Sequence, residues 1–321
     1  MISKETETDV LSEEMMRSLL RTEYIGSRLF CLSQVDSTNE ELKRRFTADA
    51  DLPDGTVAIT SDQTAGKGRR GRSWVTPPGA NIAMSIFLRP KVDPSAASML
   101  TIVAALAVSR ACSELTGLDC QIKWPNDVVA DGKKICGILT EMSVKMVEHT
   151  GNEDDSDLKK MPERFETVPR DNKNPDRPDS VSEKAGEKNP VSKIEYVIVG
   201  IGVNVNTPSF PPDLSDKATS LKLLCDRSFD KNKLAALIFA HFERLYDEFL
   251  KCRNLEFMMD EYNALLVSQG KTVRVLDPKG EYEGTSVGIN DKGELLVKMS
   301  DGTERQVYAG EVSVRGVYGY V

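Results

Sequence analysis

A long polar tract separates two apolar segments that each have the composition of a β-strand. The two segments are residues 137–144 and 196–205, and strands close in sequence are usually neighbours in a sheet. Residues 151–193 between them contain five prolines, 11 acidic residues and 9 basic residues. A tract of this composition cannot bury enough apolar surface to offset its ordering entropy. We therefore predict a disordered insertion at 145–193 that carries no chemistry and interrupts a folded sheet.

The segments around this insertion predict an α+β domain. Apolar segments with helical periodicity are expected to form helices, and Gly117 follows the first of them as a residue suited to a left-handed helix stop. Segments rich in β-branched residues are expected to form strands. The predicted helices are 98–115, 231–250 and 255–268, and the further predicted strands are 29–32, 55–60, 81–88 and 121–124.

The chain changes character at residue 271. Short alternating segments follow, separated by tight turns such as Asp-Lys-Gly and Ser-Asp-Gly, which is the pattern of a small antiparallel β structure. We therefore expect three parts: a polar extension at 1–28, a main domain at 29–269 and a small C-terminal β-barrel at 270–321.

Composition excludes several classes of protein. The 42 basic and 50 acidic residues give a net charge of -8, so a general nucleic-acid binder is not expected. No uninterrupted apolar run approaches the roughly 20 residues that cross a bilayer, and the acidic N-terminus is unlike a signal or transit peptide. The six cysteines lack a CxxC spacing and are expected to be reduced packing residues. Together these features favour a cytoplasmic protein.

Residues 63–74, Gln-Thr-Ala-Gly-Lys-Gly-Arg-Arg-Gly-Arg-Ser-Trp, form the most informative segment. Their glycines spell GxGxxG, but a dinucleotide-binding loop opens directly into a helix, and the prolines at 77 and 78 prevent that here. A Walker loop is excluded because Gly68 follows Lys67 where that motif has Gly-Lys-Ser/Thr. The segment is either a flexible loop that wraps an anionic ligand or an ordinary solvated basic loop.

Three further motifs each have a functional and a structural interpretation. Ser37 and Glu40 have the spacing of a capping box, which predicts a helix start with reciprocal side-chain caps. Residues 123–127, Lys-Trp-Pro-Asn-Asp, either point a lysine inward or simply end a strand in a turn. Residues 200–206, Gly-Ile-Gly-Val-Asn-Val-Asn, either let a flat ligand approach the backbone or form a β-bulge.

Together these signals resemble one family, the biotin protein ligases or holocarboxylase synthetases. The family's motifs occur in the family's order over residues 29–206, and the resemblance continues more weakly into the C-terminal part. The matching pieces are residues 36–39 (Asp-Ser-Thr-Asn), 63–74, 123–127, 134–139 (Lys-Ile-Cys-Gly-Ile-Leu) and 200–204.

The resemblance implies an ATP-dependent ligase. Such enzymes convert biotin and ATP, with Mg²⁺, into biotinyl-5′-AMP and pyrophosphate, and then transfer biotin to one lysine of a carrier domain in a carboxylase such as acetyl-CoA carboxylase. The implied fold is a class II aminoacyl-tRNA synthetase-like mixed sheet flanked by helices, followed by an SH3-like barrel. Neither DNA nor a membrane is an expected partner, and the sequence indicates no oligomeric state.

The resemblance also implies roles for individual residues. Lys123 and Arg69 are the implied catalytic pair, with Lys123 on the carboxylate of biotin and Arg69 on the phosphate, and Asp127 is an implied Mg²⁺ ligand. Lys67 stands where the family's loop usually carries arginine. The implied biotin-binding residues are Ser37, Thr38, Asn39, Gln63, Gly66, Lys67, Gly68, Arg69, Lys123, Gly137, Gly200 and Gly202. The implied ATP-binding or adenylate-binding residues are Arg69, Arg70, Arg72, Trp74, Lys123, Asn126 and Asn204.

Three other functions remain as alternatives. A lipoate or octanoate ligase shares the implied fold, although the Gly-Arg loop and the Lys-Trp-Pro-Asn-Asp motif favour biotin. A biotin-responsive repressor is disfavoured, because residues 1–28 are acidic and too few for a helix-turn-helix domain. A catalytically silent nucleotide-binding module is disfavoured by the joint presence of Lys123 and Arg69.

Overall fold

The computed structural model describes residues 10–75, 77–147, 191–278, 280–309 and 313–316. The chain divides into two compact units, residues 1–144 with 194–321, and residues 145–193. Residues 148–190 of the predicted disordered insertion lie outside the described residues. The prediction is wrong at its two ends, because residues 145–147 and 191–193 belong to strands of the main sheet. The boundaries expected at 28 and 269 separate parts of the first unit and stay predictions.

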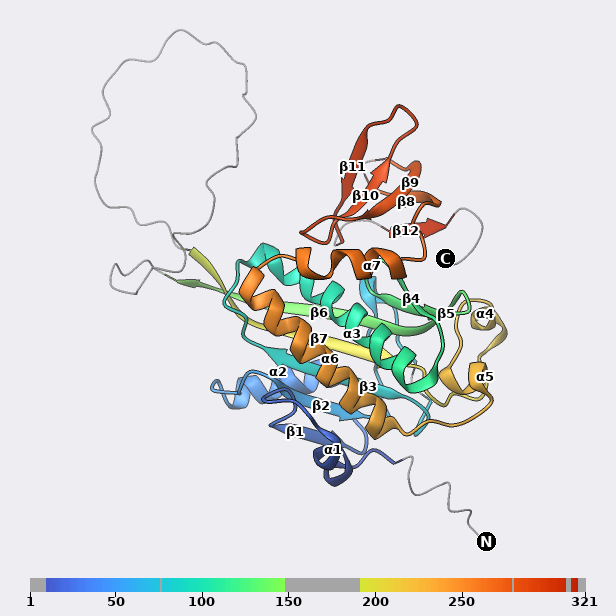
Figure 1. The fold of residues 1–321 in the computed structure, drawn as a ribbon. Coiled ribbons are helices and arrows are strands. Elements are labelled where there is room, and N and C mark those ends of the chain that lie inside the picture. The colour runs from blue at the N-terminus through green and yellow to red at the C-terminus, as the bar shows by residue number, and fades with distance from the viewer. Residues whose placement is uncertain (1–9, 76, 148–190, 279, 310–312, 317–321) are drawn as a thin grey trace, which may run out of the picture. The chain divides into compact units, whose positions relative to one another are not determined.

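The first unit contains a seven-stranded mixed sheet in the order β1-β2-β3-β7-β6-β5-β4 (Figure 1). Strands β1 and β2 pair in parallel, whereas β3 pairs antiparallel with both β2 and β7, and β5 pairs antiparallel with both β4 and β6. The strands are β1 (Leu29–Leu32), β2 (Thr56–Thr60), β3 (Ile82–Leu88), β4 (Cys120–Lys123), β5 (Asp127–Ala130), β6 (Lys133–Val147) and β7 (Val191–Val203).

Helices cover this sheet. The long helices α3 and α6 lie side by side, and α2 packs against β2 and β3 (Figure 1). Gly117 ends α3 with a φ of 78°, as the sequence predicts. The helices are α1 (Glu13–Leu19), α2 (Thr38–Ala48), α3 (Met99–Thr116), α4 (Pro212–Ser215), α5 (Leu221–Cys225), α6 (Lys231–Cys252) and α7 (Met259–Leu265), with short 3-10 turns η1 (Arg69–Gly71), η2 (Pro94–Ser98) and η3 (Glu256–Met258).

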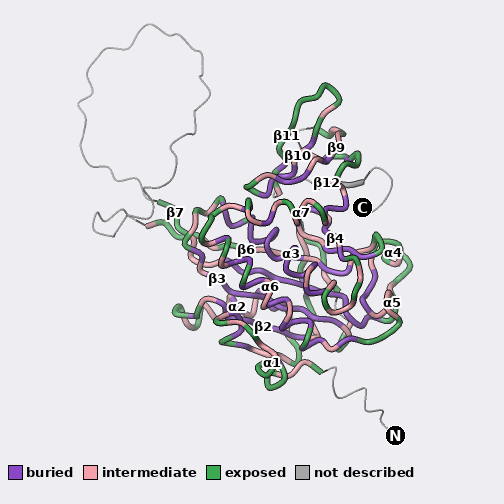
Figure 2. Tube along the Cα trace, viewed as in Figure 1, coloured by how far each residue is buried: buried purple, intermediate pink, exposed green. Residues whose placement is uncertain are grey.

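The core occupies both faces of the sheet. Successive side chains of a strand point to opposite faces, so Val57 and Ile59 join the large cluster that includes α3 and α6, whereas Ala58 joins a smaller cluster with Leu42 of α2. Every residue of β2 and β3 is buried (Figure 2). The central strands are therefore a rigid platform for side chains at their ends.

One helical stretch among the described residues is long and apolar enough to cross a membrane. It spans residues 94–116, and an 18-residue window within it has a mean hydropathy of 1.6. However, 83% of that window is buried inside the fold. Serine and threonine residues break its apolar run, which is why the sequence analysis identified it only as an apolar helix. Its burial against α6 is typical of a core helix.

A second, five-stranded antiparallel sheet has the order β11-β10-β9-β8-β12. The indole Nε1 of Trp124, in the turn after β4, donates a 3.0 Å hydrogen bond to the carbonyl of Gly293 in this C-terminal part. The strands are β8 (Thr272–Leu276), β9 (Tyr282–Ile289), β10 (Leu295–Lys298), β11 (Glu304–Val307) and β12 (Ser313–Gly316).

Candidate active site

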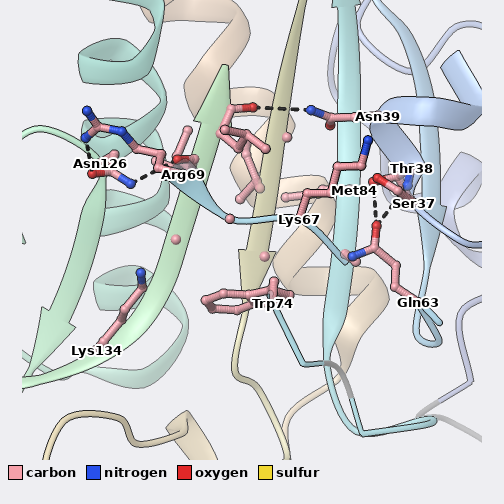
Figure 3. A pocket seen from close by; sticks show the side chains of 18 residues that line it. Ser37, Thr38, Asn39, Gln63, Lys67, Arg69, Trp74, Met84, Asn126 and Lys134 are labelled. Carbon is pink, nitrogen blue, oxygen red and sulfur yellow. Dashed lines mark hydrogen bonds between the residues drawn. The ribbon is translucent and has the colours of Figure 1, made fainter. Parts of the chain in front are cut away.

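A pocket lies on the central strands β3, β7 and β6 and is bordered by the start of α2 and the loop at 63–74 (Figure 3). Its empty volume is about 490 Å³, a figure that includes its solvent-open mouth. The lining residues are Ser37, Thr38, Asn39, Gln63, Lys67, Gly68, Arg69, Trp74, Ala83, Met84, Asn126, Lys134, Gly137, Ile138, Leu139, Gly200, Ile201 and Gly202. Most residues implied by the family resemblance are thus brought together.

The polar end of the pocket is the first turn of α2. Thr38 and Asn39 are buried there, and the Oε1 atom of Gln63 accepts hydrogen bonds from the backbone N (2.8 Å) and Oγ1 (3.1 Å) of Thr38. Buried Ser85 of β3 donates to Oδ1 of Asn39 at 2.5 Å, and its Oγ lies 2.6 Å from Oγ1 of Thr38. The side chains are therefore fixed before any ligand binds. Sequence reasoning did not identify Ser85, because only the pairing of β3 beside α2 places it there.

The predicted capping box is wrong. Ser37 is the N-cap residue of α2, but its side chain makes no capping hydrogen bond, and its backbone N donates instead to Oδ1 of Asp36 at 2.7 Å. The Glu40 carboxylate binds Lys43 and Lys67 rather than reaching back to Ser37. The Ser37 hydroxyl is consequently available to the pocket that it lines.

The loop at 63–74 folds back on itself as a small hairpin. The backbone N of Gly68 donates to the carbonyl of Arg72 at 2.7 Å, and the backbone N of Trp74 donates to the carbonyl of Gly66 at 2.9 Å. The left-handed φ values of Arg70 (57°) and Gly71 (71°) make the turn. Gly66 does not line the pocket. It allows the two arms of the hairpin to approach each other, because a Cβ there would lie 2.3 Å from the Trp74 carbonyl oxygen.

Arg69 is a half-buried cation of the loop. It donates to Oδ1 of Asn126 at 2.8 Å (Figure 3). It also donates to the backbone carbonyl of Ala309 in the C-terminal part, and both acceptors are uncharged. Burial, reinforced by nearby Arg70, lowers the pKa of the Arg69 guanidinium. A partly desolvated cation bonded to neutral groups is suited to binding an anion. The structure does not bring Arg70 and Arg72 into the lining; both are exposed on the outside of the turn.

Two lysines, Lys67 and Lys134, line the pocket, whereas Lys123, which the family resemblance placed there, does not. Lys123 ends β4, which is the edge strand of the sheet and lies two strands away from β6. Lys134 is the second residue of β6 and lines the pocket, and its Nζ lies 2.6 Å from Oδ1 of Asp127 and 5.4 Å from the Trp74 ring centroid. The signal that could have found Lys134 is its place at the head of the Lys-Ile-Cys-Gly-Ile-Leu motif.

Two glycines let the Trp74 indole lie flat on the sheet. A Cβ on Gly202 would lie 2.5 Å from the Trp74 ring, and one on Gly137 would lie 3.0 Å from it. The indole Nε1 is buried without a hydrogen-bond partner among the described residues. An unsatisfied buried donor is uncommon, and one beside a pocket is available to a bound ligand.

Asn204 and Asp127 lie outside the pocket lining. Asn204 is buried, its Nδ2 donates to the carbonyl of Thr219 at 3.1 Å, and its Oδ1 faces Asn81, so it fixes loops behind the site. The Asp127 carboxylate is engaged by Lys134. Among the described residues there is also no group of three or more His, Cys, Asp or Glu side chains able to hold a metal ion.

The fold and the pocket define a mixed-sheet α+β protein whose pocket carries cationic and polar side chains suited to a small anionic ligand. Residues 31–151 match the Biotin/lipoate A/B protein ligase family, and residues 269–315 match the Biotin protein ligase C terminal domain. The bifunctional ligase/repressor BirA of Bacillus subtilis is 30% identical over 311 residues, which cover 95% of this chain and 79% of the relative. The chain belongs to the biotin protein ligase family, and it is a ligase.

Two other relatives agree with this assignment. A biotin--[acetyl-CoA-carboxylase] ligase of Mycobacterium tuberculosis is 28% identical and aligns over 96% of this chain and 98% of its own. The structure of the biotin protein ligase from Aquifex aeolicus in complex with biotin and ATP is 25% identical, with a TM-score of 0.67. That similarity covers 90% of this chain and 99% of the other.

Proposed function

We propose that this ligase activates biotin with ATP and transfers it to a lysine of carrier domains of biotin-dependent carboxylases, acetyl-CoA carboxylase among them. The observation that carries the proposal is the placement of Arg69 and Lys134 on one pocket with the buried polar groups of Ser37, Thr38 and Asn39. The names of relatives support it: ligands seen with the Aquifex protein are biotin and ATP, and the mycobacterial protein is named for acetyl-CoA carboxylase.

The first half-reaction brings two anions together. The biotin carboxylate attacks the α-phosphorus of ATP, a carboxyl C–O–P bond forms, and the bond to the leaving pyrophosphate breaks. Negative charge gathers on the phosphoryl oxygens in the transition state, so cations already fixed in place stabilise it. We assign this work to the ammonium of Lys134, positioned by Asp127, and to the guanidinium of Arg69, positioned by Asn126.

In the second half-reaction the acceptor lysine's neutral amine attacks the mixed anhydride carbonyl. An amide forms, AMP leaves and the amine loses its proton to solvent. The loop at 63–74 covers the pocket from the side of Arg69 and Trp74, which would exclude water from an intermediate that hydrolyses readily. The ring of biotin is assigned to the polar end at Thr38, Asn39 and Gln63, and the adenine to the face of Trp74.

Mg²⁺ is proposed as part of the ATP substrate, where it neutralises phosphate charge. Magnesium is usually held by one or two carboxylates together with substrate phosphates. The Asp127 carboxylate beside the pocket is engaged by Lys134, so the donor set of this site fits a metal that arrives with the nucleotide better than one bound by Asp127. We therefore assign Asp127 the role of positioning the Lys134 ammonium group rather than that of a Mg²⁺ ligand.

Finer features of the fold and the setting are also part of the proposal. The five short antiparallel strands β8–β12 support an SH3-like barrel, and the mixed sheet backed by α3 and α6 supports the class II synthetase-like arrangement. All six cysteines are free thiols, which supports a reducing compartment and a cytoplasmic location.

Helix α1 packs on α6 as part of the ligase fold, and its Met16 is buried. We therefore do not assign DNA binding to this helix, although relatives are named repressors.

The proposal is tested by intact-mass analysis of a carrier domain incubated with the enzyme, Mg-ATP and biotin. We expect one biotinyl group on the wild-type carrier and none on a carrier whose acceptor lysine is replaced by arginine. A parallel reaction with lipoate should leave the carrier unchanged. Modification by lipoate rather than biotin would instead support the lipoate ligase alternative.

A further inference from the structure

An ion pair joins the loop at 63–74 to helix α2, in addition to the hydrogen bonds between Gln63 and Thr38. The Nζ atom of Lys67 lies 2.6 Å from Oε1 of Glu40, although the two residues are 27 positions apart. The Lys67 side chain is 48% exposed and that of Glu40 is 29% exposed. An isolated ion pair of this exposure would contribute little to stability. The contribution of this pair therefore depends on how well each side chain is held in place.

Glu40 is held in place by a chain of charges that leads to the pocket. The Nζ of Lys43 lies 2.9 Å from the same Oε1 of Glu40 and 2.8 Å from Oε1 of Glu141 on β6. The other oxygen of Glu141 accepts a 2.7 Å hydrogen bond from Nδ2 of Asn39. Lys43, itself bonded to Glu141 on the sheet, holds the Glu40 carboxylate in place. Less side-chain entropy is therefore lost when Glu40 pairs with Lys67 of the loop.

The local backbone leaves Glu40 free for this contact. In a capping box a glutamate at this position would accept from the Ser37 backbone N, but Asp36 already takes that donor at 2.7 Å. The Lys67 and Lys43 ammonium groups lower the pKa of the Glu40 carboxyl below its usual range. Glu40 is therefore charged throughout the neutral pH range and faces the loop.

We propose that Glu40 is a positioning residue that holds the 63–74 loop closed over the pocket through Lys67. Lys67 and Arg69 are two residues apart in this loop, so the pair at Glu40 restrains the segment that presents Arg69 and Trp74 to the site. On the proposed function, which this step assumes, releasing the pair lets biotinyl-AMP escape before it meets the carrier domain.

The restraint itself is tested without any substrate by limited trypsin digestion. The loop offers cleavage after Lys67, Arg69, Arg70 and Arg72, and Glu40→Gln retains all of these sites. We expect Glu40→Gln to speed cleavage in the loop about threefold to fivefold, the size of a loss near 1 kcal/mol. Glu41→Gln is the matched control, because Glu41 pairs with Arg44 and Arg45 on the same helix and not with the loop.

A double-mutant cycle separates the pair from general effects on α2. With cleavage after Arg70 and Arg72 as the readout, Lys67→Gln should speed digestion as much as Glu40→Gln, and the double variant no more than either alone. Equal rates for wild type and Glu40→Gln, equal acceleration by Glu41→Gln, or additive effects of the two variants would each overturn the proposal.

Escape of the intermediate is measured with the carrier domain omitted. Glu40→Gln should form biotinyl-AMP and release it about threefold to fivefold faster than wild type and Glu41→Gln, seen as biotin on lysines of a bystander protein. If Glu40→Gln is digested faster but neither the wild type nor any variant forms biotinyl-AMP, the proposed function is refuted and the restraint of the loop by Glu40 is supported. Unchanged escape despite normal adenylation would refute the role of Glu40 in retention.

Discussion

The Nζ atom of Lys134 lies 2.6 Å from Oδ1 of Asp127, at the edge of a pocket that Asn126 and Lys134 both line. This pair sets the direction of the ammonium before substrate arrives. Asp127→Asn should therefore slow biotin-dependent pyrophosphate release about tenfold, the effect of losing roughly 1.4 kcal/mol of charge positioning.

The same variant distinguishes positioning from metal binding. If Asp127 acts on Lys134, the Mg²⁺ concentration that gives half-maximal rate is the same for Asp127→Asn and wild type. A rise of that concentration in the variant would show instead that Asp127 ligates the metal.

Gly200 makes room for Asn39. A Cβ at position 200 would lie 2.4 Å from Oδ1 of Asn39, far inside van der Waals contact, so Gly200→Ala must displace that side chain. We expect a biotin Kd at least tenfold higher by isothermal titration calorimetry. Gly202→Ala is the comparison, since its Cβ would meet the Trp74 ring; it should weaken adenylate binding more than biotin binding. Equal biotin affinity for Gly200→Ala and wild type would contradict the assigned role of Asn39.

Asp36 gives a prediction for pH. Hydrogen bonds from Arg44 (2.7 and 2.8 Å) and from the Ser37 backbone N lower the pKa of the Asp36 carboxyl from 3.8 to about 2. Because the folded-state pKa is lowered, the pair stabilises the fold fully above pH 3.8, and that contribution is lost as the pH falls toward 2. Carboxyl ¹³C NMR should show Asp36 titrating near 2, and Arg44→Gln should raise that pKa toward 3.8. A pKa near 3.8 in the wild type would show that the pair does not form in solution.

Glu243 predicts a large effect on stability far from the pocket. Its carboxylate on α6 accepts hydrogen bonds from three backbone N–H groups, those of Glu23, Tyr24 and Ile25, at 2.6, 3.0 and 2.8 Å. Glu243→Ala leaves these donors without their acceptor, and we expect the free energy of unfolding to fall by about 3 kcal/mol. Urea denaturation measures it. Glu248→Ala on the same helix is the control, because Glu248 is exposed and pairs with Lys251 one turn away. Similar losses of stability in both variants would refute the role assigned to the hydrogen bonds of Glu243.

Local patterns in the sequence predicted most elements of the fold. The strand at 29–32 and the helix that ends before Gly117 follow from residue preferences of short segments, and the structure confirms both. Strand β5 was missed, because Asp127 was interpreted as a turn residue and residues 128–130 form too short a segment after it to be recognised as a strand. Strand β12 was also missed, because it has four residues and its antiparallel partner β8 lies 37 to 43 residues earlier in the chain.

The composition of the site was less predictable than the fold. Thr38, Gln63 and Arg69 were assigned from motifs and do line the pocket. Lys123 was placed there by the family resemblance of residues 123–127, but the order of strands, which no local pattern encodes, puts β4 at the sheet edge, and the pocket is lined by Lys134 instead. Glu40 was interpreted as a helix cap, because the competing partner Lys67 becomes a neighbour only in the folded chain.

The most direct test of the account compares Lys134→Met with Lys123→Met in biotin-dependent release of pyrophosphate from ATP. We predict that the wild-type enzyme releases pyrophosphate only with biotin, that Lys134→Met loses at least 100-fold in rate, corresponding to about 2.7 kcal/mol or more of transition-state stabilisation, and that Lys123→Met stays within about threefold of wild type. A large loss in Lys123→Met with normal activity in Lys134→Met would contradict the assignment of the catalytic ammonium group.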